Sequence, residues 1–160
     1  MEVMQTILIQ IVVAVIIAGI SSFITVRLSL NKFRTEKWWE KRVEAYERVL
    51  EAFYQAKRYS SEHLDADYLE THISKERDEE LIAYSRKAKN EIERVSDIGS
   101  FLLSATAMNV IHEYQKEKNA SYRAEFDSFQ DHAEHDYELV TKYLNEFSAV
   151  AKIDLKSEQT

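Results

Sequence analysis

The chain has 160 residues and a formal net charge of −7, with two Gly, no Pro and no Cys. This length corresponds to about one domain, and the absence of Cys excludes disulfides and thiolate metal sites. Because Gly and Pro for tight turns are almost missing and helix-forming residues abound, the composition predicts an all-α protein.

The N-terminal segment is strongly apolar, and positions 3–26 contain no charged side chain. At about 1.5 Å of rise per helical residue these positions reach roughly 36 Å, more than a hydrocarbon core of about 30 Å. Residues 1–30 are therefore predicted to form a transmembrane helix. Cleavage as a signal peptide is not expected, because no basic residue precedes the apolar run and the run is too long.

Small and mildly polar side chains follow one another along the predicted span. We call this set the polar stripe; its members are Gln10, Ala14, Ala18 and Ser22 at four-residue steps, with Ser21 and Thr25 beside them. Such a stripe lets helices approach closely and form hydrogen bonds across their interface, and an amide without a partner in lipid is costly. We predict that the spans self-associate into a homo-oligomer and meet or line a pore along this stripe; the alternative is that lipid merely tolerates these residues.

Basic residues follow the span directly. Six Lys or Arg and two Glu give positions 27–42 a charge of +4, which leaves −11 for the rest of the chain. Basic flanks stay in the cytoplasm, so the sequence predicts a single-pass protein of the bacterial inner membrane with its N-terminus outside. Contacts with lipid head groups are expected from Arg27, Lys32, Arg34 and Lys37. Nucleic-acid binding is the less favoured use of this cluster, because the acidic remainder would repel phosphate.

Residues 31–155 are predicted to form a cytoplasmic, antiparallel four-helix bundle whose first helix continues from the span to about Leu64. Ser74 and Ser104 are candidate N-caps of the second and third helices, and Gly99 is the candidate stop of the second. Residues 156–160 are predicted to be a disordered tail, and no cofactor is expected. The inner face of the last helix is expected to contain Phe126, Phe129, Ala133, Tyr137, Val140, Leu144, Phe147 and Ala151.

A short string, Arg58-Tyr59-Ser60-Ser61-Glu62-His63, resembles the Arg and His signature of the HEPN superfamily, helical bundles that often dimerise and cut RNA. The resemblance implies a metal-independent ribonuclease in which His63 transfers a proton and Arg58 stabilises phosphate charge. On a regular helix the two positions lie about 140° apart. Catalysis would therefore need a helix end or bend near Ser61, or two subunits meeting there. The alternative, which we favour, is a structural pair without activity.

Three other histidines were considered as ligands. His132 and His135 are three residues apart, beside carboxylates, a pattern that can hold a transition metal. No matching Glu-x-x-His pair exists on another predicted helix, so we expect a solvated face and no metal site. His112 is expected on the inner face of its helix, as a core histidine.

The whole arrangement of one N-terminal span, a basic neck and a helical bundle also contains the run Trp38-Trp39-Glu40-Lys41-Arg42-Val43-Glu44-Ala45-Tyr46 and the Arg-x4-His pair. It resembles the small membrane accessory proteins of RNA-targeting type VI-B CRISPR loci and similar phage-defence effectors, although Tyr59 departs from the residue usual after the Arg. The resemblance implies a HEPN-like bundle that assembles into rings in the inner membrane and depolarises the infected cell, with a cytosolic defence protein as candidate partner. The alternatives are a membrane-tethered ribonuclease and a non-catalytic adaptor that recruits a cytosolic partner.

Overall fold

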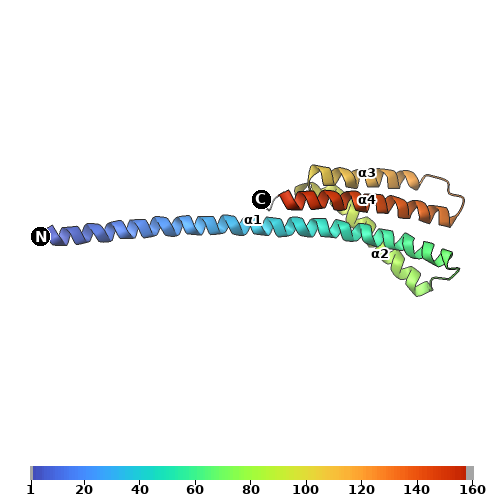
Figure 1. Ribbon diagram of the computed structural model, residues 1–160, viewed down its shortest axis with the longest axis horizontal. Coiled ribbons are helices and arrows are strands. Elements are labelled where there is room, and N and C mark those ends of the chain that lie inside the picture. Colours follow the sequence, from blue (N-terminus) through green and yellow to red (C-terminus); the bar gives the residue numbers. More distant parts are fainter. Residues whose placement is uncertain (1, 158–160) are drawn as a thin grey trace. The chain divides into compact units, whose positions relative to one another are not determined.

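The structure, a computed structural model, describes residues 2–157, and side chains within residues 16–156. Four α-helices and one 3-10 helix make up this described part, which contains no strand (Figure 1). The prediction of an all-α chain with four helices is confirmed. Two compact units divide the chain, residues 1–41 and residues 42–160.

The first unit is the N-terminal part of helix α1, which runs over Glu2–Tyr68. Of the described side chains from Ile16 to Lys41, all except Trp39 are exposed. Within the described residues α1 is the one helix long and apolar enough to cross a membrane. The large apolar side chains that it exposes at its N-terminal end are Ile16, Ile17, Ile20, Phe23, Ile24, Val26, Leu28 and Leu30.

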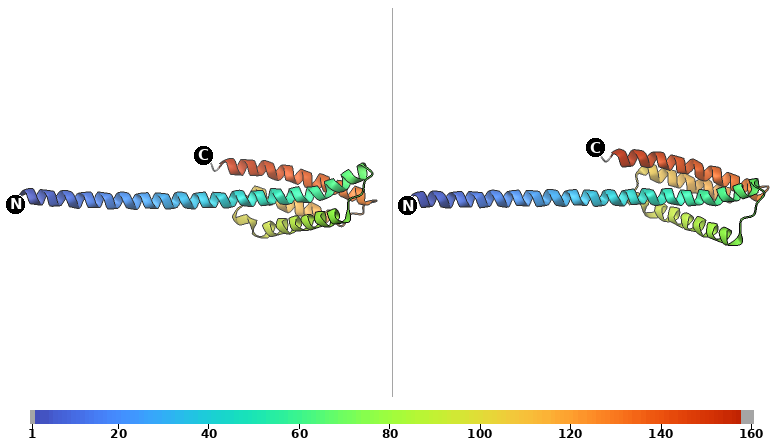
Figure 2. Two further views of the ribbon diagram at one scale, coloured as in Figure 1. Left: turned by 90° about the horizontal axis from the view of Figure 1, so that it is seen from below. Right: turned by 60° about the horizontal axis from the view of Figure 1, so that its bottom comes forward.

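The second unit is an antiparallel bundle made by the C-terminal part of α1 with α2 (Lys75–Ile98), α3 (Ala105–Ser121) and α4 (Phe129–Ser157). Each helix runs opposite to the one before it, and α3 lies beside α4 (Figure 1). Figure 2 shows α2 and α4 on different sides of this part of α1. A short 3-10 helix, η1 (Gly99–Phe101), joins α2 to α3.

Aromatic rings dominate the core of the bundle. Phe53 lies with its ring centroid 4.9 Å from that of Tyr114 and 5.9 Å from that of Phe147, and Phe147 lies 5.6 Å from Tyr46. Tilted and edge-to-face contacts at such distances add to the free energy gained by burying the rings. Three of these four side chains, Tyr46, Phe53 and Phe147, are fully buried, so the helical period predicted for α1 and α4 does place these three residues inside.

Both predicted serine caps are confirmed. The Ser74 hydroxyl accepts a hydrogen bond from the Arg77 amide at 3.2 Å, and the Ser104 hydroxyl accepts one from the Ala107 amide at 3.0 Å. Gly99 does end α2, but with a φ of −71° rather than a left-handed conformation. Its small size is what matters, because a Cβ at Gly99 would lie only 2.7 Å from a methyl group of Val95.

Helix α1 ends four residues later than predicted, in a turn built from main-chain hydrogen bonds. The Thr71 amide donates to the Ala66 carbonyl at 2.8 Å, and the Glu70 amide donates to the Asp67 carbonyl at 3.0 Å. This pairing is the Schellman pattern, in which the first residue beyond the end of the helix adopts a left-handed conformation. Glu70 supplies that conformation with a φ of 50°.

The prediction that Phe126 and Phe129 belong to the inner face of the last helix is wrong. Helix α4 begins only at Phe129 because Ser128 caps it: the Ser128 hydroxyl accepts from the Asp131 amide at 3.0 Å and donates to the Asp131 carboxylate at 2.9 Å. Phe126 therefore lies before the helix, and Phe129 in its first turn is 52% exposed. The inner face starts at Ala133.

Candidate functional site

Arg58 lies on α1 and is engaged by its own helix. Its Nε donates to Glu62 Oε1 at 2.8 Å, one helical turn further on. Glu62 is also contacted from α2, where Arg77 Nε donates to Glu62 Oε2 at 2.8 Å and Arg77 Nη2 donates to Oε1. The guanidinium of Arg77 thus forms a two-point pair with the carboxylate, the strongest geometry for these two groups.

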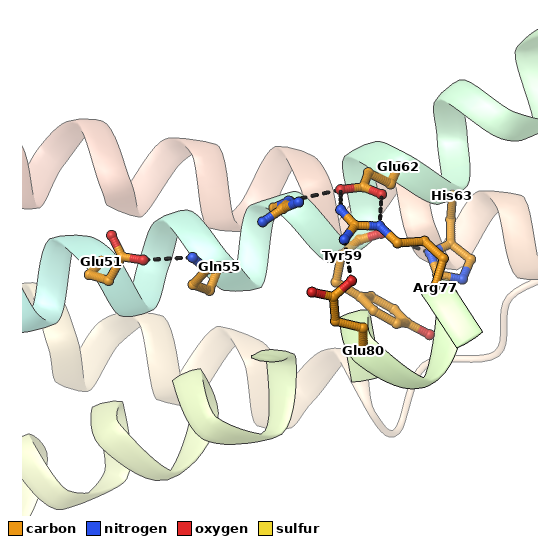
Figure 3. Close-up of polar contacts among 8 residues, drawn as sticks. Glu51, Gln55, Tyr59, Glu62, His63, Arg77 and Glu80 are labelled. Carbon is orange, nitrogen blue, oxygen red and sulfur yellow. Dashed lines mark hydrogen bonds and ion pairs between the residues drawn. The ribbon is translucent and has the colours of Figure 1, made fainter. Parts of the chain in front are cut away.

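Arg77 also reaches a second carboxylate, since its Nη1 donates to Glu80 on its own helix (Figure 3). Hydrogen bonding from Arg77 lowers the pKa of Glu62 below its ordinary value, and hydrogen bonding from Arg77 likewise lowers the pKa of Glu80. Both carboxylates therefore stay ionised at neutral pH. The result is a four-residue ion network, Arg58, Glu62, Arg77 and Glu80, that ties α1 to α2.

His63 belongs to a different set of contacts. Its Nδ1 donates to the main-chain carbonyl of Tyr59 at 2.8 Å, while its Nε2 lies 3.1 Å from Asp78 Oδ1 on α2. The imidazole also packs between two rings, with centroids 4.4 Å from Tyr59 and 5.4 Å from Phe129. Both ring nitrogens face acceptor oxygens, so the two hydrogen bonds form together only when both nitrogens carry a proton.

The structure therefore gives Arg58 and His63 separate partners within one chain. The sequence argument required a helix end or bend near Ser61 for the two to converge; α1 does not end there but continues to Tyr68, and the two side chains still have separate partners. Arg58 is occupied by a carboxylate, and His63 is held by a carbonyl and a carboxylate. Within this chain Arg58 contacts the next turn of its own helix, and His63 contacts both its own helix and α2. The two side chains do not form a joint phosphate site.

The other histidines are also placed. His112 is exposed, which corrects its predicted position on the inner face: α3 buries Ile111, and the next residue along a helix points about 100° away. The Phe126 ring lies beside both His132 and His135, with centroid distances of 4.9 and 5.3 Å. The described residues contain no cluster of three or more His, Asp or Glu side chains suited to a metal ion.

In the first unit, four members of the polar stripe can be described: Ala18, Ser21, Ser22 and Thr25 are all exposed. Gln10 and Ala14 lie outside the residues whose side chains are described. The Thr25 hydroxyl donates to the Ser21 carbonyl at 2.8 Å, so this group is satisfied by its own helix and does not need a partner in lipid.

Two of the predicted head-group residues have acidic neighbours on the same helix. Lys32 lies 3.8 Å from Glu36, and Lys37 lies 2.5 Å from Glu40. Such exposed pairs are weak, typically below about 1 kcal/mol, so they leave the lysines able to turn toward an anionic surface. No ion pair to Arg27 or Arg34 occurs in the described part of the chain.

A cleft that the sequence did not reveal lies among all four helices of the second unit, with a volume of about 440 Å³. At its wall Asp136 is only 8% exposed, with Lys118 Nζ 2.5 Å from its Oδ1 and His132 Nε2 3.8 Å from its Oδ2. Oδ1 is thus enclosed and held by the Lys118 ammonium, and Oδ2 faces the more distant His132 ring. The string Asp131 to Asp136 suggested a solvated acidic face, and only the packing against α3 shows that Asp136 is buried.

Two tyrosines of the cleft respond to this buried charge. Burial first, and then the negative charge of Asp136, raise the pKa of Tyr114 far above its ordinary value. Burial, followed by the charges of Asp78 and Asp136, also raises the pKa of Tyr59. Both phenols therefore remain neutral and keep their hydroxyl protons for hydrogen bonding.

Together, the fold and these sites define a helical-bundle protein with one candidate membrane span. Comparison of the chain with known proteins found no matching family, no similar curated sequence and no similar solved structure.

Proposed function

We propose that the protein is a single-pass inner-membrane effector that self-associates through its span and perturbs the bilayer, with the bundle in the cytoplasm. One observation carries the proposal: the apolar side chains from Ile16 to Leu30 are all exposed, each of the large ones by 50% or more. An apolar surface of this extent on a helix needs lipid or another apolar surface around it. The basic residues that follow support the proposed orientation.

Small side chains exposed along the span support self-association. In lipid no hydrophobic force drives helices together, so close packing at small residues and polar contacts must hold them, at roughly 0.6–2 kcal/mol per polar contact. Ala18 and Ser22 are small and exposed on successive turns. Because the Thr25 hydroxyl already donates to the Ser21 carbonyl, the proposed interface relies on Gln10, Ala14, Ala18 and Ser22 rather than on Thr25.

We propose a non-enzymatic role for the bundle. Arg58 is paired through Nε with Glu62, and both ring nitrogens of His63 face protein oxygens, which favours structural roles for the two residues. The resemblance to membrane accessory proteins of type VI-B CRISPR loci extends the proposal to phage defence, in which assembly of the spans depolarises the cell. The main alternative function is an adaptor that only recruits a cytosolic partner. In an adaptor the span would be only an anchor, whereas in the proposed effector the spans contact one another.

The test replaces Ala14 and Ala18 together by Leu. The double substitution raises hydrophobicity, so the protein should stay in the membrane, but it should shift the oligomer distribution and abolish depolarisation on overexpression. The control pair Val12→Leu and Ile16→Leu lies about 160° around the helix from Ala14 and should behave like wild type. Crosslinking in membranes and a voltage-sensitive dye read the two outcomes.

Two results would count against the proposal. If both double variants match wild type in crosslinking and dye response, the span is only an anchor and the adaptor function replaces the effector function. A reporter enzyme active only in the periplasm, fused after Thr160, should be silent; strong activity would reverse the proposed orientation.

A further inference from the structure

We propose that the cleft among the four helices of the bundle binds a mononucleotide. This inference is independent of the membrane function, because all the residues that carry it belong to the second unit. The volume of about 440 Å³ falls within the roughly 300–1,000 Å³ typical of small-molecule sites. Three features of the lining suit a nucleotide: an aromatic and aliphatic wall and a buried acceptor for the base, and a cationic rim for the phosphate.

The wall of the cleft suits a flat ring. Tyr59 from α1 and Tyr114 from α3 line it, together with Ile92 from α2 and Val140 from α4. Tyr114, Ile92 and Val140 are buried in the bundle, so this wall is held rigidly by the core. Bases stack on aromatic side chains with little dependence on sequence, and a rigid wall loses little entropy when the ligand binds.

The rim carries positive charge. Lys89 Nζ and Lys118 Nζ lie 5.5 and 5.0 Å from the centroid of the Tyr122 ring, so one side chain of the rim contacts both ammonium groups. Arg86 lies three residues before Lys89 on α2. It is exposed, lines the cleft and has no ion pair in the described part of the chain. A free guanidinium beside an ammonium is the arrangement that binds a phosphate group.

The deep end of the cleft offers acceptors. Asp136 lines the cleft with its Oδ1 held by Lys118 and its Oδ2 3.8 Å from the His132 ring, and a carboxylate oxygen can accept from an N–H group on the edge of a base. Ser60 is 3% exposed and also lines the cleft, and its hydroxyl has no hydrogen bond among the described residues. A base that placed an N–H group at Asp136 Oδ2 would therefore add a hydrogen bond to the carboxylate oxygen that Lys118 does not hold.

The experiment is isothermal titration of the full-length protein in detergent with GMP, because the edge of guanine carries N–H donors for a carboxylate oxygen. Guanosine and inorganic phosphate are the comparison ligands. Wild type should bind one GMP per chain, guanosine more weakly, and phosphate alone too weakly to displace GMP. Arg86→Gln should weaken GMP binding about tenfold or more, as expected for loss of a charged hydrogen bond.

The matched control is Lys87→Gln, next to Arg86 on the same exposed helix surface but lining a different groove. It should change GMP affinity less than twofold. A second variant, Ser85→Phe, places a ring in the cleft and should abolish binding while circular dichroism shows a folded bundle. The proposal is overturned if wild type does not bind GMP, if Arg86→Gln and Lys87→Gln weaken binding equally, or if a folded Ser85→Phe variant still binds.

Discussion

Tyr46 offers the sharpest test of how the bundle is held together. The side chain is fully buried on α1, and its hydroxyl donates to Asp154 Oδ2 at 2.5 Å and accepts from the Ser104 amide at 3.1 Å. One phenol therefore links α1 to the start of α3 and to the end of α4. The substitution Tyr46→Phe keeps the ring against Phe147 and removes only this link.

The magnitude follows from the two hydrogen bonds. A hydrogen bond to a carboxylate contributes about 1.5–3 kcal/mol, and a buried amide left without an acceptor costs a further 1 kcal/mol or more. Asp154 keeps its hydrogen bond from the Ser104 hydroxyl at 2.6 Å, so we expect a total loss of about 2–3 kcal/mol in the free energy of unfolding. For a unit of roughly 120 residues this corresponds to a fall of about 8–12 °C in Tm.

Thermal unfolding of the purified protein, followed by far-ultraviolet circular dichroism, measures the change. The control is Tyr54→Phe on the same helix, whose side chain is 52% exposed and whose loss of a hydroxyl should shift stability by less than about 0.5 kcal/mol. Equal Tm values for Tyr46→Phe and wild type would show that the phenol is not a link among the three helices, and equal losses in both variants would point to a general effect of hydroxyl removal.

Two further predictions concern packing and pH. Gly99→Ala should destabilise the bundle by about 1–3 kcal/mol, because its Cβ would meet Val95 and Met108. The control Gly19→Ala, with no atom within 4 Å of the new Cβ, should leave the unfolding of the bundle unchanged. Equal Tm values for the two variants would contradict the packing argument. The pKa of Glu62 is lowered from 4.5 in the folded protein, so its stabilisation is complete above about pH 4.5 and is lost as the pH falls through the lowered folded value. Glu62→Gln should therefore lower Tm at pH 7 and by progressively less as the pH falls below 4.5, and a difference in Tm that stays constant with pH would refute this.

Local signals in the sequence predicted the parts of the fold that depend on neighbouring residues. Ser74 and Ser104 could be recognised as caps because a cap hydroxyl bonds an amide only three residues away. Ser128 caps in the same way, but the apolar spacing of Phe126 and Phe129 imitates a helix face and concealed the boundary. The position of His112 was missed for a related reason, since a helical face defined by period alone is uncertain by about one residue, or 100°.

Contacts between helices could not be predicted, because they depend on how far one helix slides along another. The pair of Arg77 with Glu62 joins positions 15 residues apart, and the pair of Lys118 with Asp136 joins α3 to α4. Neither pair has a sequence signature. The first pair holds the Glu62 carboxylate that Arg58 also contacts, and the second pair forms the deep end of the cleft. The candidate nucleotide site is therefore a product of packing, whereas the candidate span could be predicted from composition alone.

The turn after α1 has a consequence for how this sequence can change over time. The hydrogen bonds that close it, from the Glu70 and Thr71 amides, are between main-chain atoms, with one added bond at 3.3 Å from the Thr71 hydroxyl to the Ala66 carbonyl, and residues 68–72 are exposed. Most substitutions there should be close to neutral, so the segment is free to drift. Position 70 is different, since Glu in the left-handed region is strained by about 1 kcal/mol relative to Gly. Among descendants of this chain, Gly or Asn should replace Glu70 often and β-branched residues almost never, while its neighbours vary without a pattern.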